Sequence, residues 1–250
     1  MTAARRPNGR RPERIACRAV LLDAGGVIVL PDRGLVAGTL ARIGVGVDPS
    51  VVPRAHYRAV CRLDHHVCAG APSHGYVPLF CRALGVPAER LSDAVEAISR
   101  VADRSRSGAI LWSEPAPYAK STIAALGRVG IAAVIVTNSD GHAASNLRDA
   151  GVCDTRPGAA VLVTDVIDSG RVGSEKPAPD IFRAALRRAG VEAREAVHVG
   201  DMLSADIAGA RAAGIVPIHL DPYRTCRAGD HRHVRWLNGV WRHIVWGNST

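Results

Sequence analysis

The sequence predicts an α/β fold, a doubly wound parallel sheet with helices on both faces. Four short apolar runs are typical of strands buried on both faces, and helical patterns lie between them. Strands that alternate with helices form βαβ units, in which parallel strands are joined through crossover helices. With 47% hydrophobic and 22% charged residues, the 250-residue chain can build a substantial core. The predicted strands are 19–22, 132–136, 196–199 and 215–220.

Regular structure is expected to begin near Ile15. Residues 1–14 are rich in Arg and Pro and have no apolar period, so they are predicted to form a disordered basic tail. The α/β core is then expected to comprise residues 15–31 and 114–222.

The first predicted strand is followed by a long region without a convincing strand. Residues 32–113 contain four helical segments, which is too much chain for one crossover. We expect an all-helical insert here. Because ligands of open α/β sheets bind beyond the carboxyl ends of the strands, such an insert would cover the site as a lid. The segments are 34–43, 51–68, 76–84 and 87–104.

Helix ends are marked clearly in the second half of the chain. A helix is predicted from Pro179 to Gly190, and another is expected to start at a Ser204 cap and to stop at Gly214. Residues 146–150 are predicted to form the end of a third helix. The apolar stretch at 165–168 is interpreted as a loop.

The net charge of +9 lies at the two ends of the chain. Residues 1–18 carry six Arg and one acid, residues 222–250 carry five Arg and one acid, and residues 19–221 carry 21 charges of each sign. A nucleic-acid footprint should lie on the folded face rather than in two tails, so no nucleic-acid partner is expected. The 223–250 extension, basic and Trp-containing, is predicted to pack on the core or on a second subunit.

No membrane association is expected either. The longest apolar stretch, 131–136, is far shorter than the ~18 residues of a membrane span, and the arginine-rich start lacks a signal-peptide pattern. The protein is therefore predicted to be cytoplasmic.

The six cysteines are expected to be reduced thiols, because a chain of this size needs no disulfide staple. One group of side chains has residue types that suit zinc, but its spacing differs from that of structural zinc sites. These residues are interpreted as helix and loop residues of the insert. They are Cys61, His65, His66, Cys68 and His74.

Polar side chains stand at the ends of three predicted strands. Asp23, Thr137 and Asp201 each follow a strand, so a parallel sheet would gather them at one edge. Carboxylates, here including Asp206, suit Mg²⁺, whereas a hydroxyl and Lys176 suit phosphoryl oxygens. This combination points to phosphoryl transfer.

Four motifs in order resemble those of the haloacid dehalogenase superfamily, most of whose members are Mg²⁺-dependent phosphatases. They occupy residues 21–28, 134–138, 176–177 and 199–201, the last followed by Asp206. The resemblance implies a Rossmann-like core of subfamily I, with the helical insert as a small cap of the C1 type. It also implies a small phosphate ester as substrate, and a monomer or a homodimer.

The resemblance assigns roles to individual residues. Asp23 would be the nucleophile that accepts the phosphoryl group as an aspartyl-phosphate, and Lys176 would neutralise it. Thr137 and Asn138 would bind phosphate oxygens, Thr137 through its hydroxyl and Asn138 through its backbone amide.

The resemblance also implies a magnesium site and contains one departure. Asp23, Asp201 and Asp206 would hold the ion together with the backbone carbonyl of Gly25. Phosphatases of the superfamily usually carry a second Asp, the general acid and base, at the position of Gly25. General acid–base catalysis is typically worth ~10²–10⁴-fold, so slow turnover of alkyl phosphates is expected.

Three interpretations of that departure remain open. The protein is a phosphatase in which water, the substrate or a histidine of the insert (His65, His66 or His74) handles the proton. Alternatively, it is a phosphate-binding regulatory protein that has lost turnover. The least favoured alternative is a dehalogenase, because such enzymes do not need the metal-binding Asp201 and Asp206.

Overall fold

The computed structural model describes residues 13–69, 75–103 and 109–246, so most of the predicted N-terminal tail lies outside the described residues. Its centre is a parallel sheet of six strands in the order β6-β5-β2-β7-β8-β9. Strands are present at all four predicted positions. The strands are β2 (Ala19–Leu22), β5 (Ala132–Thr137), β6 (Asp165–Asp168), β7 (Ala196–Gly200), β8 (Val216–Leu220) and β9 (Arg232–Val234).

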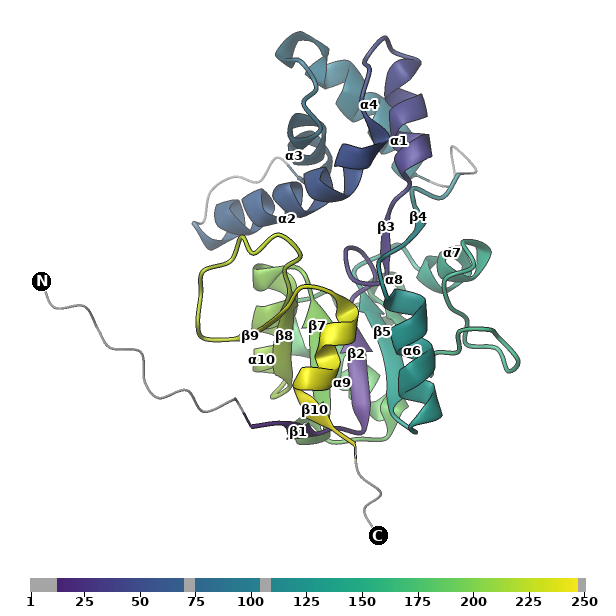
Figure 1. Cartoon of the computed structure of the whole chain (residues 1–250), viewed down its shortest axis with the longest axis vertical. Helices are drawn as coiled ribbons and strands as arrows, with labels where there is room; N and C mark the ends of the chain where they lie inside the picture. Colours follow the sequence, from purple (N-terminus) through teal and green to yellow (C-terminus); the bar gives the residue numbers. More distant parts are fainter. Residues whose placement is uncertain (1–12, 70–74, 104–108, 247–250) are drawn as a thin grey trace, which may run out of the picture.

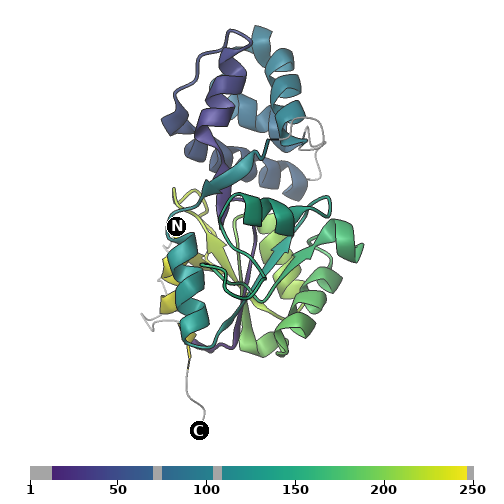
Figure 2. The same ribbon diagram turned by 90° about the vertical axis from the view of Figure 1, so that its right-hand side faces the viewer.

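Helices cover both faces of this sheet (Figures 1 and 2). Successive side chains of β2 point to opposite faces, as in any strand. Val20 and Leu22 pack in the cluster that contains α6 (Ala119–Arg128). Ala19 and Leu21 pack on the other face, against α9 (Pro179–Ala189) and α10 (Ala208–Ala212). The predicted doubly wound α/β fold is thus confirmed. The shorter helices are α7 (Ala143–Asp149), α8 (Ser169–Val172) and the 3₁₀ turns Pro49–Val51, Ala88–Arg90 and Ala193–Glu195.

Among the described residues, four helices between β3 (Val29–Pro31) and β4 (Trp112–Pro115) form a second unit with its own buried cluster. These two short antiparallel strands join this unit to the sheet. The sequence analysis did not predict them. Figure 1 shows the long helix α2 crossing the end of the sheet domain. The helices are α1 (Arg33–Ala41), α2 (Val52–Cys68), α3 (Tyr76–Ala83) and α4 (Leu91–Ala102).

Two local predictions were wrong. The stretch 165–168, interpreted as a loop, is strand β6, and the Asp168 carboxylate at its end accepts hydrogen bonds from the amides of Gly141, Ala143 and Gly170. The sequence analysis missed this strand because polar residues stand at both ends of β6 and its apolar part is very short.

Ser204 does not cap the next helix either. A π-helical turn (Leu203–Ile207) precedes α10, and the cap comes from Asp64 of α2, whose carboxylate accepts the amide hydrogens of Leu203 and Ser204. A side chain 139 residues earlier in the chain thus supplies the cap, which no local pattern can reveal.

The C-terminal segment, as far as residue 246, packs on the core of the sheet domain, as predicted. β9 forms an edge of the main sheet, and β10 (Ile244–Val245) pairs with β1 (Ile15–Ala16). A 3₁₀ helix (Leu237–Arg242) lies between β9 and β10 in the chain and buries apolar side chains. Within the described residues, no helix combines the length and the apolar character that crossing a membrane requires.

Candidate active site

Asp23 and Lys176 form a buried ion pair at the carboxyl end of the sheet. Asp23 directly follows β2, whereas Lys176 lies between α8 and α9. The Lys176 Nζ donates to Asp23 Oδ1 at 2.5 Å and to Asp206 Oδ1 at 2.7 Å. Burial by itself would lower the pKa of Lys176, but the two carboxylates raise it above its usual value. The lysine is therefore held as a cation between two acids.

Asp206 is fixed by three donors. Besides Lys176, the ring of His198 donates from Nε2 to Asp206 Oδ1 at 3.0 Å, and the amide of Met202 donates to Asp206 Oδ2 at 3.1 Å. Burial would raise the pKa of Asp206, but Lys176 and His198 lower it well below its usual value. Asp206 is thus an ionised carboxylate of fixed orientation. His198 lies in β7 and orients this carboxylate.

Asp201 is held from the helical unit. His56 of α2 donates from Nε2 to Asp201 Oδ2 at 3.0 Å, and its Nδ1 lies 2.9 Å from the hydroxyl of Tyr76. When Asp201 is ionised, as metal binding would require, its carboxylate can only accept, so the His56 proton then resides on Nε2 and Nδ1 accepts from Tyr76. Burial lowers the pKa of His56 to about 3, so the ring is neutral. No sequence signal distinguished His56 from the other polar residues of an amphipathic helix.

Three carboxylates lie close together in this site, and Lys176 donates to two of them. Ligand oxygens of Asp23, Asp201 and Asp206 lie within 4.8 Å of one another. Burial, and then the neighbouring acids, raise the pKa of Asp201 well above its usual value. Burial likewise raises the pKa of Asp23 to about 7, although Lys176 acts in the opposite direction. Bringing a divalent cation among these oxygens would relieve this repulsion, and an all-oxygen donor set suits Mg²⁺.

Thr137 and Asn138 lie at the end of β5 and line the same cleft as Asp23 and Lys176, which has a volume of about 470 Å³. The side chain of Asn138 clamps the backbone of Lys176: Oδ1 accepts its amide hydrogen at 2.8 Å, and Nδ2 donates to its carbonyl at 3.0 Å. This positioning contact was not predicted from the sequence. It couples the end of β5 to the lysine.

Gly25 also lines the cleft, and the Trp112 ring lies beside it. A Cβ placed on Gly25 would lie 3.4 Å from the Trp112 ring, so a small side chain would fit in contact with that ring. The structure does not place His65 in this cleft, although the sequence analysis named it as one of the histidines of the insert that could donate the proton. His56 is the only histidine among the described residues that line this cleft, and His65 instead lines a neighbouring cavity. His74 lies outside the described residues.

Gly26 has no room for a side chain. Its φ is +76°, and a Cβ there would lie 2.0 Å from Asp201 Oδ2 and 2.7 Å from His56 Nε2. We therefore expect Gly26→Ala to destabilise the fold by about 2 kcal/mol or more, through overpacking and backbone strain. Chemical denaturation measures this. The matched control is Gly38→Ala within α1, where the nearest atom to a Cβ is the Arg42 guanidinium at 4.0 Å and alanine should stabilise by about 0.5–1 kcal/mol. Equal effects of the two substitutions would contradict the crowding of Gly26.

Comparison with known proteins identifies the family. A family model described as haloacid dehalogenase-like hydrolase matches residues 17–214, most of the chain. The chain belongs to this family. The resemblance drawn from the motifs is thereby confirmed, and the haloacid dehalogenase-like core contains Asp23, Thr137, Lys176, Asp201 and Asp206 within the matched region.

The haloacid dehalogenase-like chain is similar to several curated phosphatases over limited stretches. It is 50% identical over 56 residues to a glyceraldehyde 3-phosphate phosphatase of Methanopyrus kandleri, covering 22% of this chain and 24% of the relative. It is 38% identical over 107 residues to a ribulose-1,5-bisphosphate 5-phosphatase of Halopiger xanaduensis, 42% of each chain. A phosphoserine phosphatase of Thermus thermophilus is 35% identical over 111 residues, 42% of this chain and 40% of the relative. The matched segments therefore span less than half of each relative.

Solved structures share the fold over nearly the whole chain. A HAD-hydrolase of Bacillus subtilis, bound to magnesium in its crystal, gives a TM-score of 0.61 at 18% identity, covering 90% of this chain and 97% of the other. A HAD phosphatase of Thermococcus onnurineus gives 0.52 at 21% identity, covering 89% and 95%. At these identities the likeness is one of fold.

Proposed function

We propose that this protein hydrolyses small phosphomonoesters through a covalent aspartyl-phosphate on Asp23, with Mg²⁺ as its cofactor. The observation that carries the proposal is the buried Asp23–Lys176 ion pair, 2.5 Å long, in a cleft that also presents Thr137 and two further carboxylates. The phosphatase names of the sequence relatives support the same class of reaction.

The proposed reaction has two displacements at phosphorus. An Asp23 oxygen attacks, the bond from phosphorus to the ester oxygen breaks, and the leaving oxygen takes a proton from water. A water molecule then attacks the phosphorus, releases inorganic phosphate and regenerates the Asp23 carboxylate. Lys176 neutralises the Asp23 carboxylate and the phosphoryl group, while the Thr137 hydroxyl and the Asn138 backbone amide donate to phosphoryl oxygens.

The metal would be held by Asp23, Asp201, Asp206 and the carbonyl of Gly25. When bound, Mg²⁺ supplies positive charge that offsets the repulsion between a carboxylate and a phosphate dianion. His198 and His56 would keep the two metal-binding carboxylates, Asp206 and Asp201, oriented for it, in the manner of outer-shell partners.

We propose that the helical unit, residues 32–113, serves as the cap that selects the substrate. Its residues His56 and Tyr76 line the cleft together with Trp112. The cleft volume of about 470 Å³ suits a small phosphorylated metabolite. All six cysteines are free thiols, which fits a cytoplasmic enzyme, acting as a monomer or a homodimer.

A panel of phosphorylated metabolites and aryl phosphates, assayed with Mg²⁺ and with EDTA, tests the proposal. We expect phosphate release with Mg²⁺, and at least about a hundredfold less after chelation, because the charge on Asp23 would then oppose the substrate. Phosphate release that is equal in EDTA would contradict the metal assignment. Release of halide from a haloacid would indicate the dehalogenase alternative.

The missing carboxylate at Gly25 gives a further prediction. In Gly25→Asp, a proton donor returns to the leaving-group side, and we expect turnover of alkyl phosphates to rise about tenfold or more while aryl phosphates, whose leaving groups need no proton, change little. The kcat ratio of the two substrate classes is the measurement. Because the new side chain must pass Trp112, the variant is also made in a Trp112→Ala background, with Trp112→Ala alone as the control.

An unchanged ratio in both backgrounds would mean that general acid catalysis does not limit turnover. Saturable phosphate binding without product, in the parent chain and in both variants, would instead support a regulatory phosphate-binding protein.

A further inference from the structure

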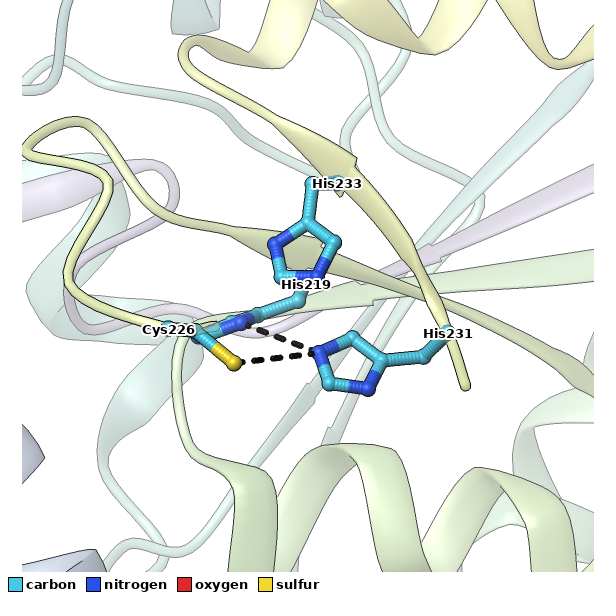
Figure 3. A group of neighbouring side chains, drawn as sticks. All are labelled: His219, Cys226, His231 and His233. Carbon is cyan, nitrogen blue, oxygen red and sulfur yellow. Dashed lines mark hydrogen bonds between the residues drawn. The ribbon is translucent and has the colours of Figure 1, made fainter. Parts of the chain in front are cut away.

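Four side chains with nitrogen or sulfur donors converge at the edge of the sheet, apart from the carboxylate site. His219 lies in β8 and His233 is its paired neighbour in β9, while Cys226 and His231 lie in the connection between these strands. One ligand atom of each lies within 4.8 Å of the others. Figure 3 shows the four side chains directed toward one another.

Two distances between the proposed ligand atoms match those of a tetrahedral zinc site. Zinc bonds of ~2.0–2.1 Å to nitrogen and ~2.3 Å to sulfur imply edges of about 3.4 Å between two nitrogens and about 3.6 Å between nitrogen and sulfur. His231 Nε2 lies 3.4 Å from His219 Nδ1 and 3.6 Å from Cys226 Sγ. Both measured edges therefore have the length that a shared zinc ion would impose.

Each histidine is held through its other ring nitrogen, the arrangement that outer-shell partners give to metal-binding histidines. His219 Nε2 lies 3.2 Å from the carbonyl of Asp201, and His233 Nε2 lies 3.1 Å from the carbonyl of Ala228. His231 Nδ1 lies 2.7 Å from a carboxylate oxygen of Asp230. All three partners only accept, so the protons reside on these outer nitrogens.

That proton placement leaves two lone pairs face to face. Neutral His219 and neutral His231 oppose unprotonated nitrogens at 3.4 Å, which is repulsive unless a cation lies between them. A metal ion satisfies both lone pairs and the cysteine thiolate.

The cysteine is brought into place by its own loop. The buried Asp221 carboxylate accepts the amide hydrogens of Thr225 and Cys226, at 3.0 and 2.8 Å, and so folds the loop back toward His219. This loop, which follows β8, helps line the cavity that also contains Asp201 and Asp64 of α2. The cluster thus fixes a segment that lies against the catalytic end of the sheet.

We propose that His219, Cys226, His231 and His233 bind one zinc ion, in a closed structural site that pins the connection between β8 and β9. Four protein ligands leave no open position for a substrate, which is typical of structural zinc rather than catalytic zinc. The thiolate and imidazole ligands distinguish this site from the all-oxygen site at Asp23.

Cobalt substitution of the full-length protein tests the proposal. With one equivalent of Co²⁺ we expect the intense visible bands of a tetrahedral ion and a near-ultraviolet charge-transfer band from the thiolate. Cys226→Ser should remove the charge-transfer band and weaken zinc binding at least about a hundredfold, more than the loss of an outer-shell partner costs. Cys68→Ser, which changes an exposed cysteine outside the cluster, should alter neither.

Two further measurements cover the possibility that a ligand variant fails to fold. Asp230→Ala keeps all four ligands and should weaken zinc binding about 10–100-fold, because it removes the carboxylate that holds His231. In the unmodified protein, zinc should slow amide hydrogen exchange in residues 221–231, and a chelator should reverse this. Absence of a thiolate band in the unmodified protein, or a band that survives Cys226→Ser, overturns the proposal. So does exchange in 221–231 that zinc leaves unchanged.

Discussion

Asp23→Asn is expected to abolish phosphatase activity, lowering kcat by at least about a thousandfold, because the amide is a poor nucleophile and carries no charge for the metal. Loss of a nucleophile of this kind cannot be compensated by the groups around it. The measurement is phosphate release from the best substrate of the panel under saturating Mg²⁺.

The stability of this variant separates lost chemistry from lost folding. Burial raises the pKa of Asp23 to about 7, so the ionised carboxylate destabilises the metal-free fold. The neutral amide should leave the melting temperature of the metal-free protein unchanged or higher. Asp180→Asn, at an exposed side chain in α9, is the control and should retain full activity. Unchanged activity of Asp23→Asn would contradict the assignment of the nucleophile.

Lys176→Met is expected to have the second-largest effect, and to change stability and activity together. Its removal leaves Asp23 and Asp206 buried without their shared cation, and breaking a buried ion pair from one side typically costs about 3–5 kcal/mol. Turnover should fall at least about a hundredfold, since no other Lys or Arg among the described residues lines this cleft. Denaturant unfolding and phosphate release measure the two effects.

The chain offers a matched control, because it contains only one other lysine. Lys120 lies on α6 and is exposed, so Lys120→Met should change stability by less than about 0.5 kcal/mol and leave turnover intact. Added Mg²⁺ should restore part of the stability of Lys176→Met by supplying charge to the three carboxylates. Equal stability of the two lysine variants would contradict the role given to Lys176.

The sequence allowed the sheet and its catalytic edge to be predicted because both depend on local pattern. A buried parallel strand is a continuous apolar run, and the residue that follows it reaches the carboxyl edge of the sheet. Asp23, Thr137 and Asp201 were located on that basis, Asp206 and Lys176 were chosen for their residue types, and the family resemblance assigned a role to each. By contrast, β6 and β9 escaped prediction because Asp165 and Asp168 flank one and Arg and His make up most of the other.

The groups that orient the site were not predictable from local pattern. His56 reaches Asp201 across 145 residues, and Asp64 reaches Leu203 across 139, so both contacts exist only once the helical unit lies over the sheet. The residue types that suit zinc were noted at Cys61, His65 and their neighbours in the insert, whereas the cluster that forms lies in and between β8 and β9. There, strand pairing rather than sequence spacing brings His219 beside His233.

Trapping the phosphorylated enzyme tests the central claim most directly. The protein is mixed with its best phosphate ester and Mg²⁺, quenched in acid within the first turnovers, digested with pepsin at low pH and examined by mass spectrometry. We predict one added phosphoryl group on the peptide that contains Asp23, at the Asp23 side chain, and none in Asp23→Asn. Phosphate release without any phosphorylated peptide, or with the group on another residue, would contradict the account.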